Sequence, residues 1–486
     1  MTVAYFTFLD VDKGIATEFP STKVAWATGN NVRITNGYVS KTLGRSLITT
    51  NPGSLAVRAA FAFVGTDGLL RTIVCCDNVV YAFNSDFTTY TDITPASAPT
   101  GGSANLWHFA LVGGLPILCN GKDGIWKWAS YAGVLTLLTG APTWAKQISS
   151  CMNRLVVSNL TEGGLTYTGR VRWSETGNPE NWTLDTTNKA GRHDIVSYNT
   201  GVEAFTDIRA QIERGHEMFF FAERGLWKTD FAAATRNFIL VNPDIEILSS
   251  QALCTKDEKF YFIGKTDLYW SGGGDPTPFG LPVRTALFDN LNEDYIGRAF
   301  AFAPHSTREV WFCVATGDAT TPNQAFVYNT ETQSFSIADV DFSCHAETAF
   351  TSIPYDILGD PQGQILRLDD GFNNADGTAI LGTIETGDLT FGLPDQMKRI
   401  SDVIPELAVQ DTVSELMVQV GVRNRLSDDI RWSDPVPFTI GVSDKCDLNG
   451  FRKEGKYVRI RFYSDIVDSP WQLSGYTIKY ETGGTR

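Results

Sequence analysis

The chain has 486 residues, of which 43% are hydrophobic and 12% aromatic, and it contains 44 glycines. This composition is typical of a globular protein with many tight turns and excludes a disordered chain. The length allows a core that needs neither disulfides nor metals for stability. A formal net charge of −15 argues against a protein that wraps nucleic acid through phosphate contacts.

The acidic excess is unevenly distributed. Residues 394–486 hold 13 Lys and Arg against 14 Asp and Glu, whereas residues 1–393 hold 27 against 41. One interpretation is that this charge only keeps the protein soluble. The more specific interpretation is that the acidic residues form a wall that DNA passes without adhering. No apolar run approaches the ~18 residues of a membrane span. The start, "MTVAYFTFLDVDKGIATEF", is acidic where a signal peptide is basic, so we expect folding in a cytoplasm.

The first expected element is a hairpin within "NNVRITNGYVSKTLGRS", centred on Asn36-Gly37. It precedes a repeating pattern of apolar strands and short turns. We therefore expect residues 1–50 to supply the strands that close a ring with the last repeat.

A repeat of about 40–50 residues runs through residues 51–375. Each unit has apolar strands joined by short turns, and one strand of each unit carries an aromatic. These marker aromatics are Tyr81, Trp126, Trp173, Trp227, Trp270 and Tyr328. A seventh unit, "YDILGDPQGQILRLDDG", is weaker. The period and the four strands per unit predict an irregular all-β propeller of six to seven four-stranded blades.

Past residue 376 the repeat stops, although strands continue. Segments such as "KRISDVIPELAV", "SELMVQVGVRN" and "KYVRIRFYSD" alternate apolar and polar residues. About 110 residues of this kind predict a C-terminal antiparallel β-sandwich-like domain over 376–486. We expect "KYVRIRF" to have one buried face and one solvent-exposed face. The alternative is that its arginines bind DNA or a membrane.

Metal and redox chemistry have little support in the sequence. The cysteines form no CxxC pair, and several lie in apolar runs, so we expect buried free thiols. The cysteines are Cys75, Cys76, Cys119, Cys151, Cys254, Cys313, Cys344 and Cys446. The histidines lack metal-ligand spacing, so we expect neither a metal site nor a cofactor. They are His108, His193, His216, His305 and His345.

The stretch "RVRWSETGNPENWTLD", residues 170–185, is similar to a degenerate Asp-box anchored on Ser174. Thr176 stands where the box has aspartate, and Gly177 comes one residue early. Even an intact Asp-box is a structural turn away from catalytic residues, so we expect a blade corner whose two tryptophans pack between sheets.

A sialidase-like propeller needs arginines, a nucleophile and carboxylates converging at one mouth. The available arginines are Arg172, Arg209, Arg214, Arg224 and Arg236. The spacing of these arginines in the sequence does not show that they converge at one mouth. "SGGGDPTPFG" lacks the lysine and helix of a phosphate-binding loop, so we expect a blade turn there. No catalytic residue is assigned, and we expect a protein that is not an enzyme.

Several stretches resemble a family of phage proteins. "VRWSETGNPENW" and "NNVRITNGYVSKTLGR" resemble proteins of phage tail modules. "GLPDQMKRISDVIPELAV" and "GKYVRIRFYSDIVDSPWQLSGYTIKYETGG", which contains Leu473-Ser474-Gly475 with Ile478, resemble the end of short-tailed phage nozzle proteins. These are also called packaged-DNA stabilisation or tail accessory (tail tubular) proteins.

The resemblance implies a structural virion protein that is assembled in the host cytoplasm. It implies a homo-oligomeric ring, a hexamer, that extends the DNA channel below the head-to-tail adaptor. Such a ring retains packaged DNA, conducts it during ejection and anchors fibres or spikes. Two alternatives stay open, namely a propeller glycosidase or carbohydrate-binding protein and a monomeric cytosolic propeller scaffold.

Overall fold

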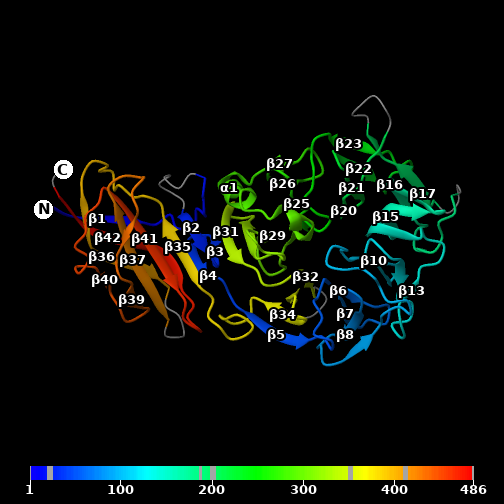
Figure 1. Cartoon of the computed structure of the whole chain (residues 1–486), viewed down its shortest axis with the longest axis horizontal. Coiled ribbons are helices and arrows are strands. Elements are labelled where there is room, and N and C mark those ends of the chain that lie inside the picture. Colours follow the sequence, from blue (N-terminus) through cyan, green and yellow to red (C-terminus); the bar gives the residue numbers. More distant parts are fainter. Residues whose placement is uncertain are drawn as a thin grey trace.

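Seven four-stranded antiparallel sheets follow one another in the part of the chain that the computed structural model describes. The described residues are 2–18, 26–184, 189–197, 204–348, 354–408 and 414–483. The first strands of neighbouring sheets contact one another around a common axis, so the sheets are the blades of a propeller (Figure 1). The prediction of an all-β propeller is confirmed, and the weak seventh repeat forms a full blade.

The strands of each blade have fixed radial positions. The first, innermost strands are β6 (Ala59–Val64), β10 (His108–Val112), β14 (Trp144–Cys151), β20 (Ala210–Arg214), β24 (Leu253–Lys256), β28 (Phe300–Phe302) and β32 (Cys344–Glu347). The second strands are β7 (Leu70–Cys75), β11 (Leu115–Cys119), β15 (Arg154–Glu162), β21 (Glu217–Phe221), β25 (Lys259–Ile263), β29 (Glu309–Val314) and β33 (Asp356–Gly359). The third strands are β8 (Val80–Asn84), β12 (Ile125–Lys127), β16 (Leu165–Trp173), β22 (Leu226–Asp230), β26 (Leu268–Ser271), β30 (Gln324–Asn329) and β34 (Gln364–Leu368).

The outermost strands are short and mostly half-exposed or exposed. They are β9 (Tyr90–Asp92), β13 (Thr136–Leu137), β17 (Gly191–Asp194), β23 (Ile239–Asn242), β27 (Thr277–Pro278), β31 (Ser334–Asp339) and β5 (Arg45–Thr50). Between blades lie a two-stranded ribbon and short helices. They are β18 (Val196–Ser197), β19 (Ala204–Phe205), η1 (Leu281–Val283), α1 (Arg284–Phe288) and η2 (Glu293–Arg298).

The apolar cores lie between neighbouring blades. Second strands are covered on both faces, so their alternating positions are all apolar, as in the buried runs Met218–Phe221 and Phe260–Ile263. The predicted marker aromatics all lie on third strands. Tyr81, Trp126 and Trp173 are buried, and the other three are half-buried, so these aromatics pack between sheets.

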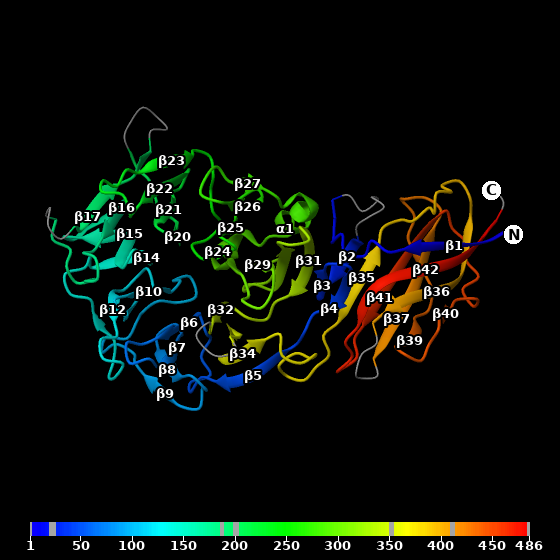
Figure 2. The same cartoon turned by 180° about the vertical axis from the view of Figure 1, so that it is seen from behind.

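Two six-stranded sheets build the second domain, and both contain strands from the N-terminal segment. One holds β1 (Thr2–Phe8), β3 (Val32–Thr35), β4 (Tyr38–Lys41), β36 (Lys398–Leu407), β40 (Cys446–Asp447) and β42 (Gln472–Thr482). The other holds β2 (Trp26–Asn30), β35 (Gly382–Thr386), β37 (Glu415–Arg423), β38 (Arg431–Trp432), β39 (Val436–Thr439) and β41 (Tyr457–Ser464). Both termini lie at this end of the elongated molecule (Figures 1 and 2).

The N-terminal segment therefore differs in part from the expectation for residues 1–50. The hairpin at Asn36-Gly37 exists as β3 and β4, with φ of +86° at Gly37, but β4 pairs with β42 of the sandwich. The strand that completes the seventh blade is β5, which pairs with β34. Local sequence identifies a hairpin, whereas its partner strand depends on a contact more than 400 residues away.

The sandwich is attached to the outer strand of the sixth blade. The Asn31 backbone N–H donates to the Ile337 carbonyl at 2.8 Å, and the Asp339 N–H donates to Asn31 Oδ1 at 2.8 Å. Next to them, Arg33 donates to Glu309 at 2.7 Å and to Asp369 at 3.0 Å. The apolar core of blades 4 to 6 is continuous with the core of the sandwich.

Candidate functional site

An axial cavity of ≈ 590 Å³ lies inside the ring of innermost strands, and each of the seven strands contributes to its wall. Its volume is in the range of sites for small molecules. The wall combines apolar side chains such as Phe109 and Phe300 with polar ones such as Ser149, Gln211 and Glu213. A cavity of this volume holds a small ligand and not a DNA duplex.

One end of the axial cavity is bridged by hydrogen bonds between opposite blades. Gln251 Nε2 donates to the Trp107 carbonyl at 3.0 Å, and His108 Nε2 lies 3.2 Å from Ser250 Oγ. Farther out, Arg298 Nη2 donates to Ser103 Oγ at 2.6 Å. Burial lowers the pKa of His108 to about 4, so this imidazole is neutral at physiological pH. The cavity is thus narrowed at the end where the innermost strands begin.

The opposite end continues into a second cavity of ≈ 380 Å³, which is lined by Glu213, Lys256, His305 and Glu347 among others. His305 Nδ1 lies 2.7 Å from the Glu347 carboxylate, while Lys256 Nζ donates to a backbone carbonyl at 2.6 Å. Burial raises the pKa of Glu213 to about 7. This mouth is the candidate site of the propeller, because it joins a ligand-sized cavity to a carboxyl group with a raised pKa.

No sequence motif marks this mouth. Glu213, His305 and Glu347 are far apart in the sequence and match no motif, and only the ring of strands brings them into one cavity. These three residues share one feature in the sequence: each lies at or near the end of the first strand of its blade.

The stretch 170–185 forms a structural corner. Arg170 and Arg172 on β16 form ion pairs with Glu162, and Trp173 and Trp182 are buried. Ser174 Oγ accepts the Leu155 N–H at 3.0 Å. This anchoring role agrees with the expected blade corner. The last residue of the stretch, Asp185, lies outside the described residues.

The arginines considered for a glycosidase have separate partners. Arg172 pairs with Glu162, Arg209 with Glu223 and Glu246, and Arg214 with Glu217. Arg214 is the member of this set that lines the mouth. Arg224 is exposed, and Arg236 lies in the β22–β23 loop of the fourth blade. The described residues therefore bring no arginine cluster to either cavity.

The thiols and histidines form no metal-binding group within the described ranges. All eight cysteines are free, and all but Cys254 are buried. Burial raises the pKa of Cys254, which lines the axial cavity, to about 12, so it is a thiol rather than a thiolate. The stretch "SGGGDPTPFG" runs from the last residue of β26 through the turn and β27, and Ser271 Oγ donates to the Gly274 carbonyl at 2.7 Å.

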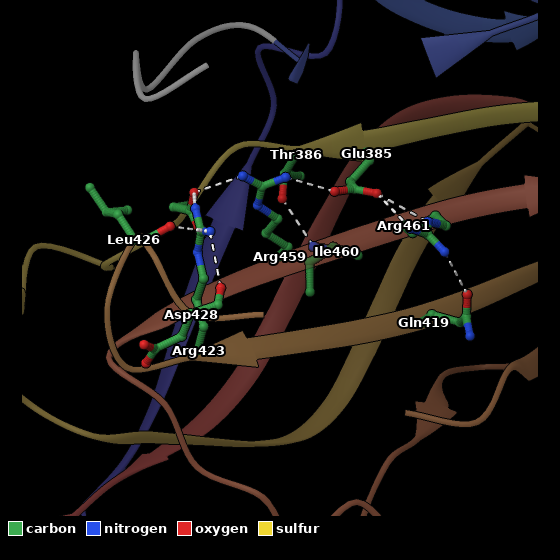
Figure 3. Close-up of polar contacts among 10 residues, drawn as sticks. Glu385, Thr386, Gln419, Arg423, Leu426, Asp428, Arg459, Ile460 and Arg461 are labelled. Atoms are coloured by element: carbon green, nitrogen blue, oxygen red, sulfur yellow. Dashed lines mark hydrogen bonds and ion pairs between the residues drawn. The ribbon is translucent and has the colours of Figure 1, made fainter. Parts of the chain in front are cut away.

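The arginines of "KYVRIRF" lie on a sheet face rich in ion pairs (Figure 3). Val458, Ile460 and Phe462 are buried, as the alternation predicts. Arg459 donates to Glu385 at 2.9 Å and to Asp388 at 2.8 Å. The Arg459 guanidinium is therefore paired with two carboxylates, one on β35 and one just after it.

Arg461 and Arg423 extend the same network. Arg461 donates to Glu385 at 2.9 Å and stacks over the Trp432 ring at 4.0 Å. Arg423 donates to Asp388 at 2.8 Å and to the Leu426 carbonyl at 2.6 Å. Arginines paired in this way are not free to contact phosphates.

No protein-family model and no curated protein matches the chain. A solved structure described as YCF48 bound to D1 peptide is similar at 11% identity and a TM-score of 0.41, covering 69% of this chain and 98% of its own. The N-terminal domain of Nup159 is similar at 9% identity and a TM-score of 0.40, covering 71% and 99%. The AfRom2 CNH domain is similar at 9% identity and a TM-score of 0.40, and the match covers 68% of this chain and 100% of that domain. The propeller is established by the sheet order of the chain itself.

None of the helices in the described ranges has the length and apolar character needed to cross a bilayer.

Proposed function

We propose that this chain is a structural subunit of a short-tailed phage tail, the nozzle at the distal end of the tail tube. The stretches that resemble nozzle proteins form β3, β4, β36, β41, β42 and the corner after β16. All of these except the corner belong to the sandwich or to its attachment to the propeller. The resemblance is thus concentrated on the sandwich, and its strand β3 also contacts β31 of the sixth blade.

The observation that carries the proposal is the interlocking of the two domains. The chain begins in the sandwich, passes through seven blades and returns to the sandwich. The Arg33–Glu309–Asp369 cluster lies at the junction, and each of its side chains is at least 86% buried. A block joined in this way resists bending between its domains, which is the property that a wall subunit of a pressurised tube requires.

The DNA path would lie between copies of the chain. The axial cavity is too small for a duplex, so a ring of subunits would enclose the conduit, with the acidic residues of 1–393 facing it. A net negative wall repels phosphates and lets DNA slide. The same proposal includes a hexameric ring located in the virion. It also includes attachment of this ring to the head-to-tail adaptor and to fibres or spikes.

Electron microscopy of the purified chain and of virions tests the proposal. We expect rings with a central opening wider than a DNA duplex and an acidic lumen, and we expect the chain at the distal tail by antibody labelling. A strongly basic lumen, or a chain absent from virions, would overturn the proposal.

A carbohydrate hydrolase acting at the mouth is the second candidate, because a carboxyl with a pKa near 7 is suited to general acid catalysis. A screen of fluorogenic glycosides distinguishes the two functions. Turnover that is lost in Glu213→Gln and kept in the exposed-turn variant Glu331→Gln would support the hydrolase. No turnover by the wild-type chain would remove it.

A further inference from the structure

The wall of the axial cavity contains carboxylates but no strong cation. Glu213 on β20 and Glu347 on β32 both line it, and among the described residues of the wall there is neither a lysine nor an arginine. His108 is neutral at physiological pH, because burial lowers its pKa to about 4. The other histidine of the wall, His345, lies 2.7 Å from the Asp356 carboxylate, which offsets any charge on the ring. The charge of the wall therefore favours a positively charged ligand over an anion.

Glu213 is the less compensated of the two carboxylates. No residue in the described ranges donates a hydrogen bond to its side chain or forms an ion pair with it. Glu347, by contrast, lies 2.7 Å from His305 Nδ1. Both glutamates line the axial cavity and also the second cavity at its mouth, so they lie at the junction of the two. A partly buried carboxylate without a cation is stabilised by one that a ligand brings.

The basic side chains at the mouth donate to other acceptors. Lys256 Nζ donates to the Pro304 carbonyl at 2.6 Å, and Arg214 Nη1 donates to the Glu217 carboxylate at 3.1 Å. Neither of them forms an ion pair with Glu213 in the part of the chain that the structure describes. The charge of Glu213 is thus left without a cation from the chain itself, and a ligand that enters through the mouth can supply it.

The aromatic side chains of the axial cavity are suited to the apolar body of a ligand. The rings of Phe61 and Phe109 stack with their centres 5.1 Å apart, and both side chains line the cavity and are only half-buried. Phe300 and Ile148 add apolar surface to the same wall. A volume of ≈ 590 Å³ is sufficient for a ligand with one aromatic ring. Aromatic faces also attract cations, so the wall favours an amine with an apolar body over a small hydrophilic cation.

We propose that the axial cavity binds a small organic cation, a primary amine with an apolar body, whose ammonium group donates to Glu213 at the junction with the mouth. Glu347 adds a second negative charge at the same junction, and the body of the ligand lies against Phe61 and Phe109. The site is inside one propeller, so it does not depend on assembly of the chain into a tail.

Calorimetric titration of the wild-type chain with benzylamine tests the site at about pH 8, where Glu213 is ionised. Benzyl alcohol and benzoate have the same ring without the positive charge, and methylamine has the charge without the ring. We expect benzylamine to bind more tightly than all three, and about tenfold more tightly than benzyl alcohol, the contribution of one charged hydrogen bond. Equal binding of benzylamine and either benzyl alcohol or methylamine, tighter binding of benzoate, or no binding of benzylamine would overturn the proposal.

Glu213→Gln locates the ammonium group, because it removes the charge and keeps the size of the side chain. We expect this variant to bind benzylamine about tenfold more weakly than the wild type and benzyl alcohol equally well. Glu347→Gln should weaken benzylamine binding by less, since this carboxylate already has His305 as a partner. Glu331→Gln, in an exposed turn, should bind like the wild type. Unchanged benzylamine binding by a Glu213→Gln chain that circular dichroism shows to be folded would overturn the site.

Discussion

Burial sets the charge of individual residues in the axial cavity. His108 lies near one end and Glu213 near the other, and desolvation is the largest cause of both pKa shifts. Removal from water disfavours the charged form of each group, so it lowers the pKa of the histidine and raises that of the carboxyl. Both groups are therefore neutral between about pH 4 and about pH 7.

Glu213 should make the protein less stable as the pH rises. Its pKa in the folded chain is about 7, above the ordinary 4.5, so the folded state holds a proton that the unfolded state releases between these values. Stability from this group is present at low pH and is lost from about pH 4.5 to about pH 7. We expect the Tm of the wild type to fall across this range relative to Glu213→Gln, as measured by circular dichroism. Glu331→Gln should follow the wild type, and parallel curves for the wild type and Glu213→Gln would contradict the prediction.

At the scale of elements, cross-strand ion pairs decide what the basic strand β41 can do. Its arginines pair with acidic residues on and just after β35, and Arg461 also stacks on Trp432 (Figure 3). Each acid neutralises an arginine that would otherwise attract phosphates. The sheet face is therefore close to neutral although the strand is basic.

Removing these acids should create a DNA-binding face. We expect the wild type to bind a fluorescent duplex weakly, and the double variant Glu385→Gln/Asp388→Asn to bind it more tightly, in a salt-dependent way. Fluorescence anisotropy at low salt measures the difference. Glu454→Gln, also in the sandwich, serves as the control. Strong binding by the wild type that is lost in Arg459→Gln would show instead that the arginines are free.

At the scale of the whole molecule, the chain path couples the two domains. Strands from both ends of the sequence complete the sandwich, and β5 closes the propeller between them. The cores of blades 4 to 6 and the sandwich are continuous. Neither domain can therefore lose its N-terminal strands without exposing apolar surface.

The two domains should unfold in one calorimetric transition. Arg33→Met leaves Glu309 and Asp369 buried without their cation, which costs about 3–5 kcal/mol. We expect this variant to show a lower Tm and a sandwich transition separated from that of the propeller. Arg425→Gln should unfold like the wild type. Two separated transitions in the wild type would contradict the coupling.

The sequence by itself determined the local pattern of this protein. Alternating apolar residues predicted strands, and the spacing of Tyr81, Trp126 and their counterparts predicted blades, because strand periodicity and turn chemistry act over a few residues. Ser174 was also identified as the anchor of a corner.

Only the tertiary structure decided which distant residues meet. It paired the Asn36-Gly37 hairpin with β42 and placed Arg33 between Glu309 and Asp369. It also gave Glu213 its raised pKa. Strand pairing, burial and charge compensation depend on contacts between segments hundreds of residues apart, and no local pattern records them.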